Sequence, residues 1–303
     1  MQKQLNSKTI NNLALKGGVL NPSARIKALA LDLDGTALLP DATLGERTAG
    51  CLKNLISRGI QVIFCTGRAI EAAEQFRIAI GAEGPMVFFN GAEVADMPSG
   101  EIISADLLDL DVVNFGIDLA RSMGIHYQIY LPAGTVIDGA KRKWEALVID
   151  KPTPESEMYR NHTGIVPVVK DLKEVIAMPG LQGCVKVMFI TDPARHDGIR
   201  QKTLDRFGSR VYVARTFPTF LEIMNAGVSK GEGLKTVMKR RRLEAGELIA
   251  LGDEENDLLM FKVAGFSAAP ANAREKVRAA ADIVFASNAE EGLAAFLENL
   301  FKI

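Results

Sequence analysis

Short apolar runs that end in polar or small residues recur in the N-terminal third of the sequence. The run from Ile26 to Leu31 ends at the carboxylate of Asp32, followed by Gly35, which is typical of a buried strand in a parallel sheet. Helical spacing of apolar residues comes next, and then a glycine and another apolar run. The pattern predicts, in order, a strand over 26–32, a helix over 43–57, a strand over 60–65, a helix over 69–80 and a strand over 86–89. This alternation is typical of βαβ units.

A second series of the same kind lies near the C-terminus. Its pattern predicts a helix over 230–242, a strand over 248–251, a turn over 252–256, a helix over 257–263 and a strand over 282–285. Because both series alternate strands with helices, we expect them to form one α/β core, a doubly wound Rossmann-like parallel sheet.

The pattern changes between the two series. Strand-like pieces dominate there and two helical segments separate some of them: strands are predicted over 126–131, 186–190, 210–214 and 220–224, and helices over 109–123 and 195–207. We interpret this region as an inserted α+β domain. The predicted organisation is an N-terminal tail over 1–24, a core over 25–90 and 227–303, and an insertion over 91–226. The tail is rich in lysine and poor in arginine, so a frayed, solvated segment explains it better than an organellar leader.

Composition and charge exclude several classes of protein. The 303 residues carry 36 Lys and Arg against 37 Asp and Glu, and a formal charge of −1 does not fit a nucleic-acid-binding surface. A chain that is 48% hydrophobic and 24% charged is far from the composition of disordered proteins. No apolar run approaches the ~18 residues that would span a bilayer, so we expect no membrane partner. The sequence makes no prediction of the oligomeric state.

Cysteine and histidine usage indicates no disulfide framework and no zinc site. Cys51, Cys65 and Cys184 form no Cys-x-x-Cys pair, and a reducing, cytoplasmic location is the default for such a chain. The three histidines lie far apart without metal-ligand spacing, and we interpret each as an ordinary surface or core residue.

Two carboxylates lie at the carboxyl end of the first predicted strand, in the segment Asp32-Leu33-Asp34-Gly35-Thr36. Side chains two positions apart share a face of a strand, so Asp32 and Asp34 could together hold a hard cation. The alternative is an ordinary Asp/Gly turn after a strand.

Two further segments begin predicted helices. Thr66-Gly67-Arg68 follows a strand, so Thr66 could cap the next helix while its hydroxyl and the Gly67 amide face an anion. Taken alone, this segment is better explained as a simple cap. Lys230 starts the later helix, where its charge opposes the helix dipole and would favour an anionic partner. Taken alone, Lys230 is better explained as a solvated lysine.

The turn from Gly252 to Asp257 packs four acids and Asn256 into six positions. Like charges at such a density cost free energy unless a cation or a lysine neutralises them. The alternative is an acidic turn on the surface, with Glu254 and Glu255 solvated.

Taken together and in this order, these segments resemble the four motifs of the haloacid dehalogenase (HAD) superfamily of phosphohydrolases. The long insertion resembles the type-IIB cap of the Cof subfamily. Further similarities are Asn90-Gly91, Gly227-Val-Ser-Lys-Gly231, Ser287-Asn288 and Glu291-Gly292. The sequence departs from the family pattern where Pro270-Ala271-Asn272 replaces the usual Gly-Asn setting and where Glu254 stands in place of the common Gly or Ser.

The resemblance implies a role for each motif residue. Asp32 would attack phosphorus to form an aspartyl-phosphate, and Asp34 would act as the general acid and base. Mg²⁺ would be held by Asp32, Asp253 and the backbone carbonyl of Asp34. The remaining contacts are implied for the phosphate: Thr66, Gly67 and Lys230 would bind its oxygens, Asn256 would orient it, and Asp257 would support Lys230 or a water on the cation.

The sequence therefore predicts a Mg²⁺-dependent phosphatase of small phosphate esters, with sugar phosphates or similar metabolites as the expected substrates. A phosphomutase of the same fold and a non-enzymatic regulator that binds sugar phosphates are the alternatives. The insertion carries no readable substrate motif, so the substrate itself and the residues that select it are not predicted.

Overall fold

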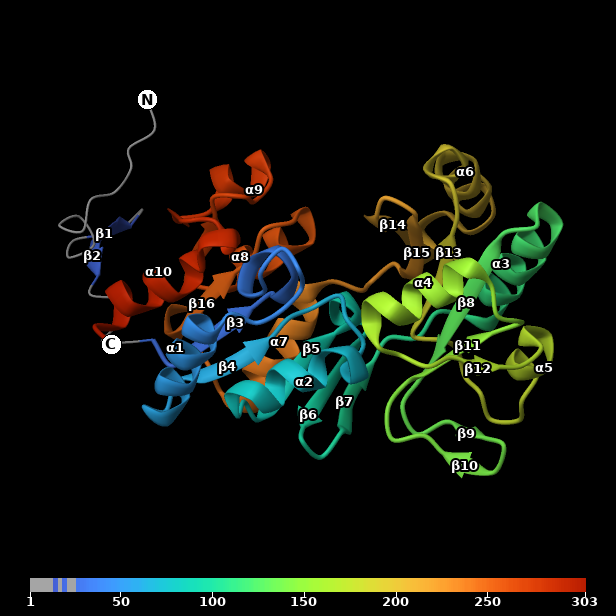
Figure 1. Cartoon of the computed structure of the whole chain (residues 1–303), viewed down its shortest axis with the longest axis horizontal. Helices are drawn as coiled ribbons and strands as arrows, with labels where there is room; N and C mark the ends of the chain where they lie inside the picture. Colours follow the sequence, from blue (N-terminus) through green and yellow to red (C-terminus); the bar gives the residue numbers. More distant parts are fainter. Residues whose placement is uncertain (1–12, 16–17, 21–25) are drawn as a thin grey trace.

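The computed structural model describes residues 13–15, 18–20 and 26–303. The chain forms two lobes, coloured blue and orange on one side and green and yellow on the other in Figure 1. Part of the predicted tail forms an antiparallel hairpin of β1 (Leu13–Leu15) and β2 (Gly18–Leu20), and the rest of residues 1–24 lies outside the described residues. None of the helices in the described ranges is long and apolar enough to cross a membrane.

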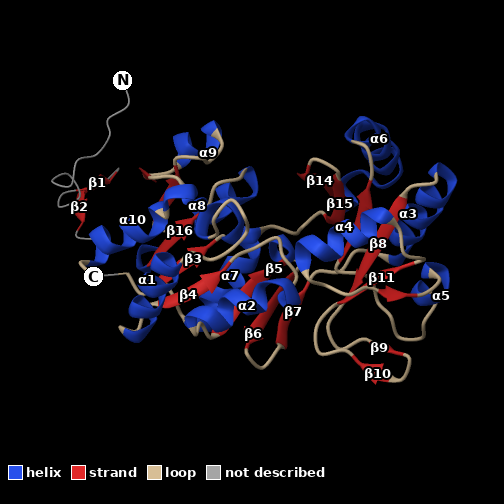
Figure 2. Ribbon diagram, in the orientation of Figure 1, coloured by secondary structure: helices blue, strands red, loops and turns tan. Residues whose placement is uncertain are grey.

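A five-stranded parallel sheet forms the centre of the first lobe, with the order β18-β17-β16-β3-β4 (Figure 2). The strands are β3 (Ala28–Leu31), β4 (Gln61–Phe64), β16 (Leu248–Leu251), β17 (Phe266–Pro270) and β18 (Ile283–Phe285). The N-terminal and C-terminal segments of the chain thus contribute strands to one sheet. This confirms the doubly wound α/β core predicted from the sequence.

Helices cover both faces of this sheet because its strands are apolar on both sides. Leu29 and Leu31 of β3 pack with α1 (Glu46–Ser57), α2 (Ile70–Ile80) and α10 (Gly292–Phe301). Ala28 and Ala30 pack with residues of α7 (Lys230–Arg241), α8 (Leu258–Val263) and α9 (Glu275–Ala280). Strands buried on both faces are expected in a parallel sheet of this kind.

Three antiparallel strands adjoin the edge of the core sheet. They are β5 (Gly84–Phe88), β6 (Glu93–Met97) and β7 (Glu101–Ala105), and a parallel bridge between Cys65 and Val87 joins β5 to β4. The boundary predicted at residues 90 and 91 precedes two of these strands. We therefore propose that the insertion begins near residue 106, and the domain limits as a whole remain predictions.

The second lobe, which we call the cap lobe, is built on a six-stranded sheet with the order β12-β11-β8-β13-β15-β14. Its strands are β8 (His126–Leu131), β11 (Ala146–Ile149), β12 (Val168–Val169), β13 (Lys186–Ile190), β14 (Val211–Phe217) and β15 (Phe220–Asn225), with a small separate hairpin of β9 (Val136–Ile137) and β10 (Ala140–Lys141). Its helices are α3 (Leu110–Met123), α4 (Pro154–Thr163), α5 (Leu172–Ile176) and α6 (His196–Phe207).

The two faces of the cap sheet differ. Val187 and Phe189 of β13 join a cluster with residues of α3, α5 and α6. Met188 and Ile190, on the other face, join the apolar cluster that continues into the core lobe. Because alternate residues of a strand point to opposite faces, every second residue of β13 and β15 is turned toward the core lobe.

Candidate active site

Asp32 and Lys230 form the centre of the candidate site. Asp32 follows β3 directly, and Lys230 is the first residue of α7, whose N-cap Ser229 accepts a hydrogen bond from the amide of Glu232. The Lys230 Nζ atom lies 2.8 Å from Asp32 Oδ1 and 2.7 Å from Asp257 Oδ1. Lys230 is 1% exposed and Asp32 is 5% exposed, which excludes a solvated lysine.

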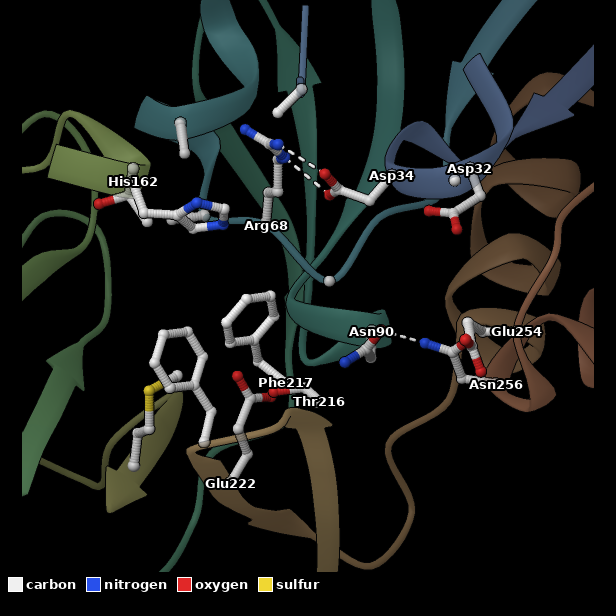
Figure 3. A pocket seen from close by; sticks show the side chains of 18 of the residues that line it. Asp32, Asp34, Arg68, Asn90, His162, Thr216, Phe217, Glu222, Glu254 and Asn256 are labelled. Atoms are coloured by element: carbon white, nitrogen blue, oxygen red, sulfur yellow. Dashed lines mark hydrogen bonds and ion pairs between the residues drawn. The ribbon is translucent and has the colours of Figure 1, made fainter. Parts of the chain in front are cut away.

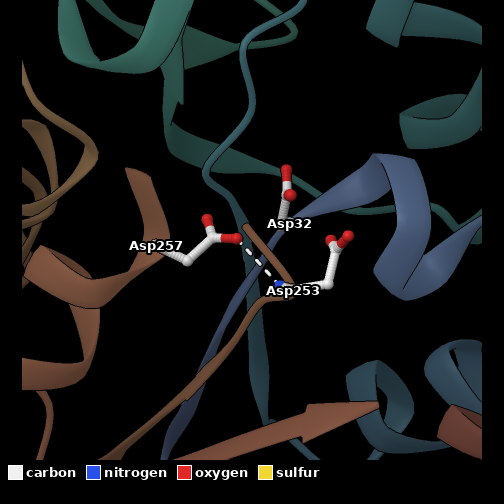
Figure 4. Close-up of side chains that lie close together, drawn as sticks. All are labelled: Asp32, Asp253 and Asp257. Carbon is white, nitrogen blue, oxygen red and sulfur yellow. Dashed lines mark hydrogen bonds between the residues drawn. The ribbon is translucent and has the colours of Figure 1, made fainter. Parts of the chain in front are cut away.

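The acidic turn after β16 supplies the other carboxylates. Asp257 Oδ2 accepts hydrogen bonds from the amides of Asp253 and Glu254, at 2.9 and 3.0 Å, and Thr36 donates to Asp253 Oδ1 at 2.8 Å. One carboxylate oxygen from each of Asp32, Asp253 and Asp257 lies within 4.8 Å of the other two. Figure 4 shows the three side chains close together. The turn is therefore not a solvated surface loop at these two aspartates, whereas its residue Glu254 is exposed and pairs with Arg274.

Burial and crowding determine the protonation of this cluster. Burial, and next the neighbouring Asp257, raise the pKa of Asp32 well above its usual value, although Lys230 acts in the opposite direction. The same two causes raise the pKa of Asp253 to about 7. Burial alone would lower the pKa of Lys230, but Asp257 and Asp32 outweigh it and raise that pKa. Three carboxylates around one ammonium leave an excess of negative charge that a further cation would neutralise.

The donor set of the cluster fits a hard divalent cation. The cluster offers carboxylate oxygens and contains no sulfur or imidazole ligand, which is the preference of Mg²⁺ rather than of zinc. Gly35, with a φ of +73°, packs closely beneath it, since a Cβ built there would lie 2.2 Å from Asp253 Oδ2. Of the predicted metal ligands, Asp32 and Asp253 lie in this cluster. The backbone carbonyl of Asp34 remains a predicted ligand.

The side chain of Asp34 is held by a residue that the sequence analysis did not assign to the site. Arg68 donates two hydrogen bonds to the Asp34 carboxylate, at 2.6 and 2.8 Å (Figure 3). Burial would lower the pKa of Arg68, but Asp34 outweighs it and raises that pKa. The guanidinium also lies 5.2 Å from the centre of the Phe76 ring. In the sequence, this contact was indicated by the position of Arg68 in the segment Thr66-Gly67-Arg68, directly after a predicted strand.

One local prediction is wrong. Thr66 does not cap α2, because that helix begins at Ile70 and has Ala69, which makes no side-chain cap bond, at its N-cap. The hydroxyl of Thr66 instead accepts a hydrogen bond from the amide of Arg68 at 3.1 Å. The three residues after Thr66 therefore form a turn before the helix, and this turn keeps Thr66 fully buried.

Gly67 and Asn256 both lie next to a second asparagine, Asn90. Asn256 donates a hydrogen bond to Asn90 Oδ1 at 3.0 Å, and a Cβ built at Gly67 would lie 3.1 Å from that same oxygen. Asn90 follows β5 and has a φ of +58°. The structure thus brings the segments after β4, β5 and β16 together, as expected at the carboxyl ends of parallel strands.

A cavity of about 440 Å³ lies between the two lobes. Five of the predicted site residues line it: Asp32, Asp34, Gly67, Lys230 and Asn256. The opposite wall comes from the cap lobe, and Figure 3 shows Phe217 and Glu222 there, facing Asp34 and Arg68. No cap residue was predicted to take part. A cavity of this size is typical of a site for a small molecule.

Comparison with known proteins agrees with this geometry. The sequence matches the haloacid dehalogenase-like hydrolases over residues 29–297. It is 28% identical over 278 residues to the 5-amino-6-(5-phospho-D-ribitylamino)uracil phosphatase YitU of Bacillus subtilis (strain 168), covering 91% of this chain and 97% of that one. It is 26% identical over 272 residues to the phosphoglycolate phosphatase of Methanopyrus kandleri, covering 89% of this chain and 95% of the relative. The crystal structure of TM0651 from Thermotoga maritima has a TM-score of 0.77 and 28% identity, covering 90% and 97% of the two chains.

The fold and the site define a hydrolase with its acidic centre at the carboxyl edge of a doubly wound sheet. The chain belongs to the haloacid dehalogenase-like hydrolase family, which confirms the resemblance drawn from its motifs.

Proposed function

We propose that this protein is a Mg²⁺-dependent phosphatase that hydrolyses small phosphate esters through a phosphorylated Asp32. The observation that carries the proposal is the buried group of Asp32, Asp253, Asp257 and Lys230 beside the cavity between the two lobes. The similarity to two proteins whose names describe them as phosphatases of small phosphate esters supports the same class of reaction.

Asp32, Asp253 and the carbonyl of Asp34 would hold the cation. When bound, Mg²⁺ would offset the repulsion between a carboxylate and a phosphate dianion. Lys230, the hydroxyl of Thr66 and the amide of Gly67 would bind the phosphoryl oxygens and stabilise the charge that spreads over them during transfer. Asn256, held by Asn90, would orient the phosphate.

In the first step, an oxygen of Asp32 would form a bond to phosphorus while the bond from phosphorus to the ester oxygen breaks. Asp34 would give its proton to that departing oxygen. In the second step, Asp34 would take a proton from water as the water oxygen attacks phosphorus, which breaks the acyl phosphate and releases inorganic phosphate. Arg68 holds the Asp34 carboxylate at the cavity wall between these proton transfers.

The cap lobe supports a small ester as the substrate. It forms the wall of the cavity opposite Asp32, which would limit the access of bulk water and leave no room for a folded phosphoprotein. Sugar phosphates or similar metabolites remain our proposed substrate class, and a type-IIB cap remains our proposed cap type. We also propose a cytoplasmic location on the basis of the cysteine usage alone.

The charges in the cavity favour a hydrolase over the two alternatives. A phosphomutase that works with a sugar bisphosphate needs a free cationic group for the second phosphate. Lys230 would bind the transferred phosphoryl group, and the other Lys and Arg among the described residues that line the cavity are paired: Arg68 with Asp34 and Lys186 with Glu222. A purely regulatory protein would not need the full set of catalytic residue types.

The test is hydrolysis of p-nitrophenyl phosphate before and after removal of divalent cations. We expect turnover to disappear on exhaustive chelation and to return when Mg²⁺ is added, because the carboxylate cluster alone repels the substrate. Full activity after chelation would contradict the role of the cation, and no turnover under any condition would contradict a phosphatase. Analysis of products with a sugar bisphosphate present would reveal a mutase instead.

A further inference from the structure

The cap wall of the cavity contains a buried ion pair that the proposed mechanism does not use. Lys186 begins β13 and Glu222 lies in β15, and these strands are hydrogen-bonded neighbours in the cap sheet. Both residues line the cavity, on the face of the sheet turned away from the apolar cluster under α3, α5 and α6. The pair therefore faces the same space as Asp32 from the opposite side.

The pair is almost completely removed from solvent. Lys186 Nζ lies 2.7 Å from Glu222 Oε1, and the two side chains are only 4% and 5% exposed. The rings of Phe89 and Tyr130 lie 5.2 and 5.3 Å from the Lys186 nitrogen. Desolvating two charges costs so much free energy that apolar residues of similar volume often stabilise a protein equally well. Stability alone therefore does not explain an ion pair at this position.

The hydrogen-bonding capacity of the pair is only partly used. Glu222 Oε2 is buried and has no hydrogen-bond partner among the described residues. Lys186 has three N–H donors, and the contact to Glu222 is its single hydrogen bond within the described part of the chain. An unsatisfied buried acceptor is costly, so a donor from outside the protein would be favoured there. A hydroxyl group can donate to Glu222 Oε2 and accept from Lys186 at the same time.

We propose that Lys186 and Glu222 select the substrate by binding an uncharged hydroxyl group at the end of the leaving group remote from the phosphate. This inference rests on the proposed phosphatase function and names the substrate class of the same site. Because the two charges of the pair cancel, a carboxylate or a second phosphate at that position would meet Glu222 without a free cation beside it.

Aromatic side chains next to the pair define the rest of the leaving group. The ring centres of Phe217 and Phe220 lie 5.1 Å apart, and the ring centre of His162 lies 5.7 Å from that of Phe217. All three line the cavity, and Phe217 is 48% exposed although its ring is apolar. An apolar stretch between phosphate and hydroxyl would cover these rings and remove their surface from water.

The first experiment uses the native protein with Mg²⁺ and needs no variant. The probes are ω-hydroxyalkyl phosphates of increasing chain length, each compared with its O-methyl ether, which lacks the donor, and with the corresponding ω-carboxyalkyl phosphate. We expect one chain length at which kcat/KM for the hydroxyl ester exceeds that of the ether by about 10- to 100-fold, the usual effect of a hydrogen bond to a charged group. The carboxylate ester should be the poorest of the three.

Equal kcat/KM values for alcohol and ether at every chain length would overturn the inference while leaving the phosphatase intact. Failure to hydrolyse any ester, p-nitrophenyl phosphate included, would contradict the proposed function instead. The two failures are therefore distinguishable.

Variants then test whether Lys186 and Glu222 cause the preference for the alcohol over the ether. Glu222→Gln should bring the ratio of alcohol to ether close to one. Because this change leaves Lys186 buried without its partner, a double variant, Lys186→Met with Glu222→Leu, provides a second test that keeps the volume and removes both charges. Glu157→Gln, at an exposed carboxylate of α4 in the same lobe, is the matched control and should keep the native ratio. A folded double variant that keeps the native ratio would overturn the assignment.

Discussion

The two walls of the cavity hold their buried charges in opposite ways. On the core side, Lys230 pairs with Asp32 and Asp257, and Asp253 adds a third carboxylate to the cluster, so negative charge is in excess. On the cap side, Lys186 balances Glu222 within an antiparallel sheet, and the charges cancel. An unbalanced cluster would attract a cation and, only through that cation, a phosphate, whereas a balanced pair would bind neutral hydrogen-bonding groups. We therefore propose that the core lobe carries the chemistry and the cap lobe recognises the leaving group.

The largest expected effect comes from removing the nucleophile on the core side. Asp32→Asn should lower kcat/KM by at least about 10⁴-fold, because a neutral amide cannot attack phosphorus and is a poorer metal ligand. The loss should be the same for every ester, whatever its leaving group. Steady-state kinetics with p-nitrophenyl phosphate and an alkyl phosphate measures it, with Asp197→Asn, at an exposed position of α6, as the control. Activity within tenfold of the native value would contradict the role of Asp32 as the nucleophile on the core side.

A smaller and more selective loss is expected at Asp34. Asp34→Asn should lower turnover of alkyl phosphates by about 10²- to 10⁴-fold, the usual contribution of general acid-base catalysis. Phosphorylation by p-nitrophenyl phosphate should suffer less, because its leaving group needs little protonation. Rapid-quench measurement of the first step with both esters gives the two ratios. Equal losses for good and poor leaving groups would show that Asp34 does not act as the general acid.

A substitution at Gly35 tests whether Asp253, on the core side of the cavity, binds the cation. A Cβ at this position would lie 2.2 Å from Asp253 Oδ2, and the φ of +73° adds strain, so Gly35→Ala should displace that carboxylate. We expect the Mg²⁺ concentration for half-maximal activity to rise about 10- to 100-fold. Gly50→Ala is the matched control, because a Cβ there meets nothing within 4 Å. An unchanged Mg²⁺ dependence in Gly35→Ala would remove Asp253 from the metal site.

The smallest expected effect is on stability and concerns another pair of buried acids, Glu93 and Glu145. Burial, and next Glu93, raise the pKa of Glu145 well above its usual value. The folded chain therefore holds a proton that the unfolded chain has lost above a pH of about 4.3. The free energy of unfolding should fall as pH rises from there toward the folded pKa, and this group contributes about 1.4 kcal/mol per pH unit.

Glu145→Gln cannot titrate, so its stability should fall less steeply over the same pH range. Urea unfolding of the native chain and the variant between pH 4 and pH 8, with divalent cations chelated, measures the difference. Glu157→Gln, which is exposed, should retain the native slope. Identical slopes for Glu145→Gln and the native chain would mean that the folded pKa of Glu145 is not raised.

The core wall could be predicted from the sequence because each of its motifs is a short contiguous segment at a strand end. Once the strands are placed in one parallel sheet, Asp32 and Asp253 meet, and the helix that starts at Lys230 places its ammonium between Asp32 and Asp257. The contact of Arg68 with Asp34 was missed because it depends on a turn between Thr66 and the helix, where a cap was expected instead.

The cap wall could not be predicted in the same way. Lys186 and Glu222 are 36 residues apart, and their contact depends on the pairing register of β13 with β15, which no local motif reports. The strand β17 was also missed, because its sequence Phe-Ser-Ala-Ala-Pro is short, rich in small residues and ends in proline. Burial between β16 and β18 determines that strand rather than its own propensity.

The central claim is that the phosphoryl group moves to Asp32 before it reaches water. The direct measurement is rapid-quench labelling of the Asp34→Asn variant with a ³²P-labelled aryl phosphate, followed by peptide mapping. Because the second step lacks its base, we predict that label accumulates on the peptide that contains Asp32, in an acid-stable and hydroxylamine-sensitive bond. Label on another residue, or continued turnover with no labelled protein at any time, would contradict the account.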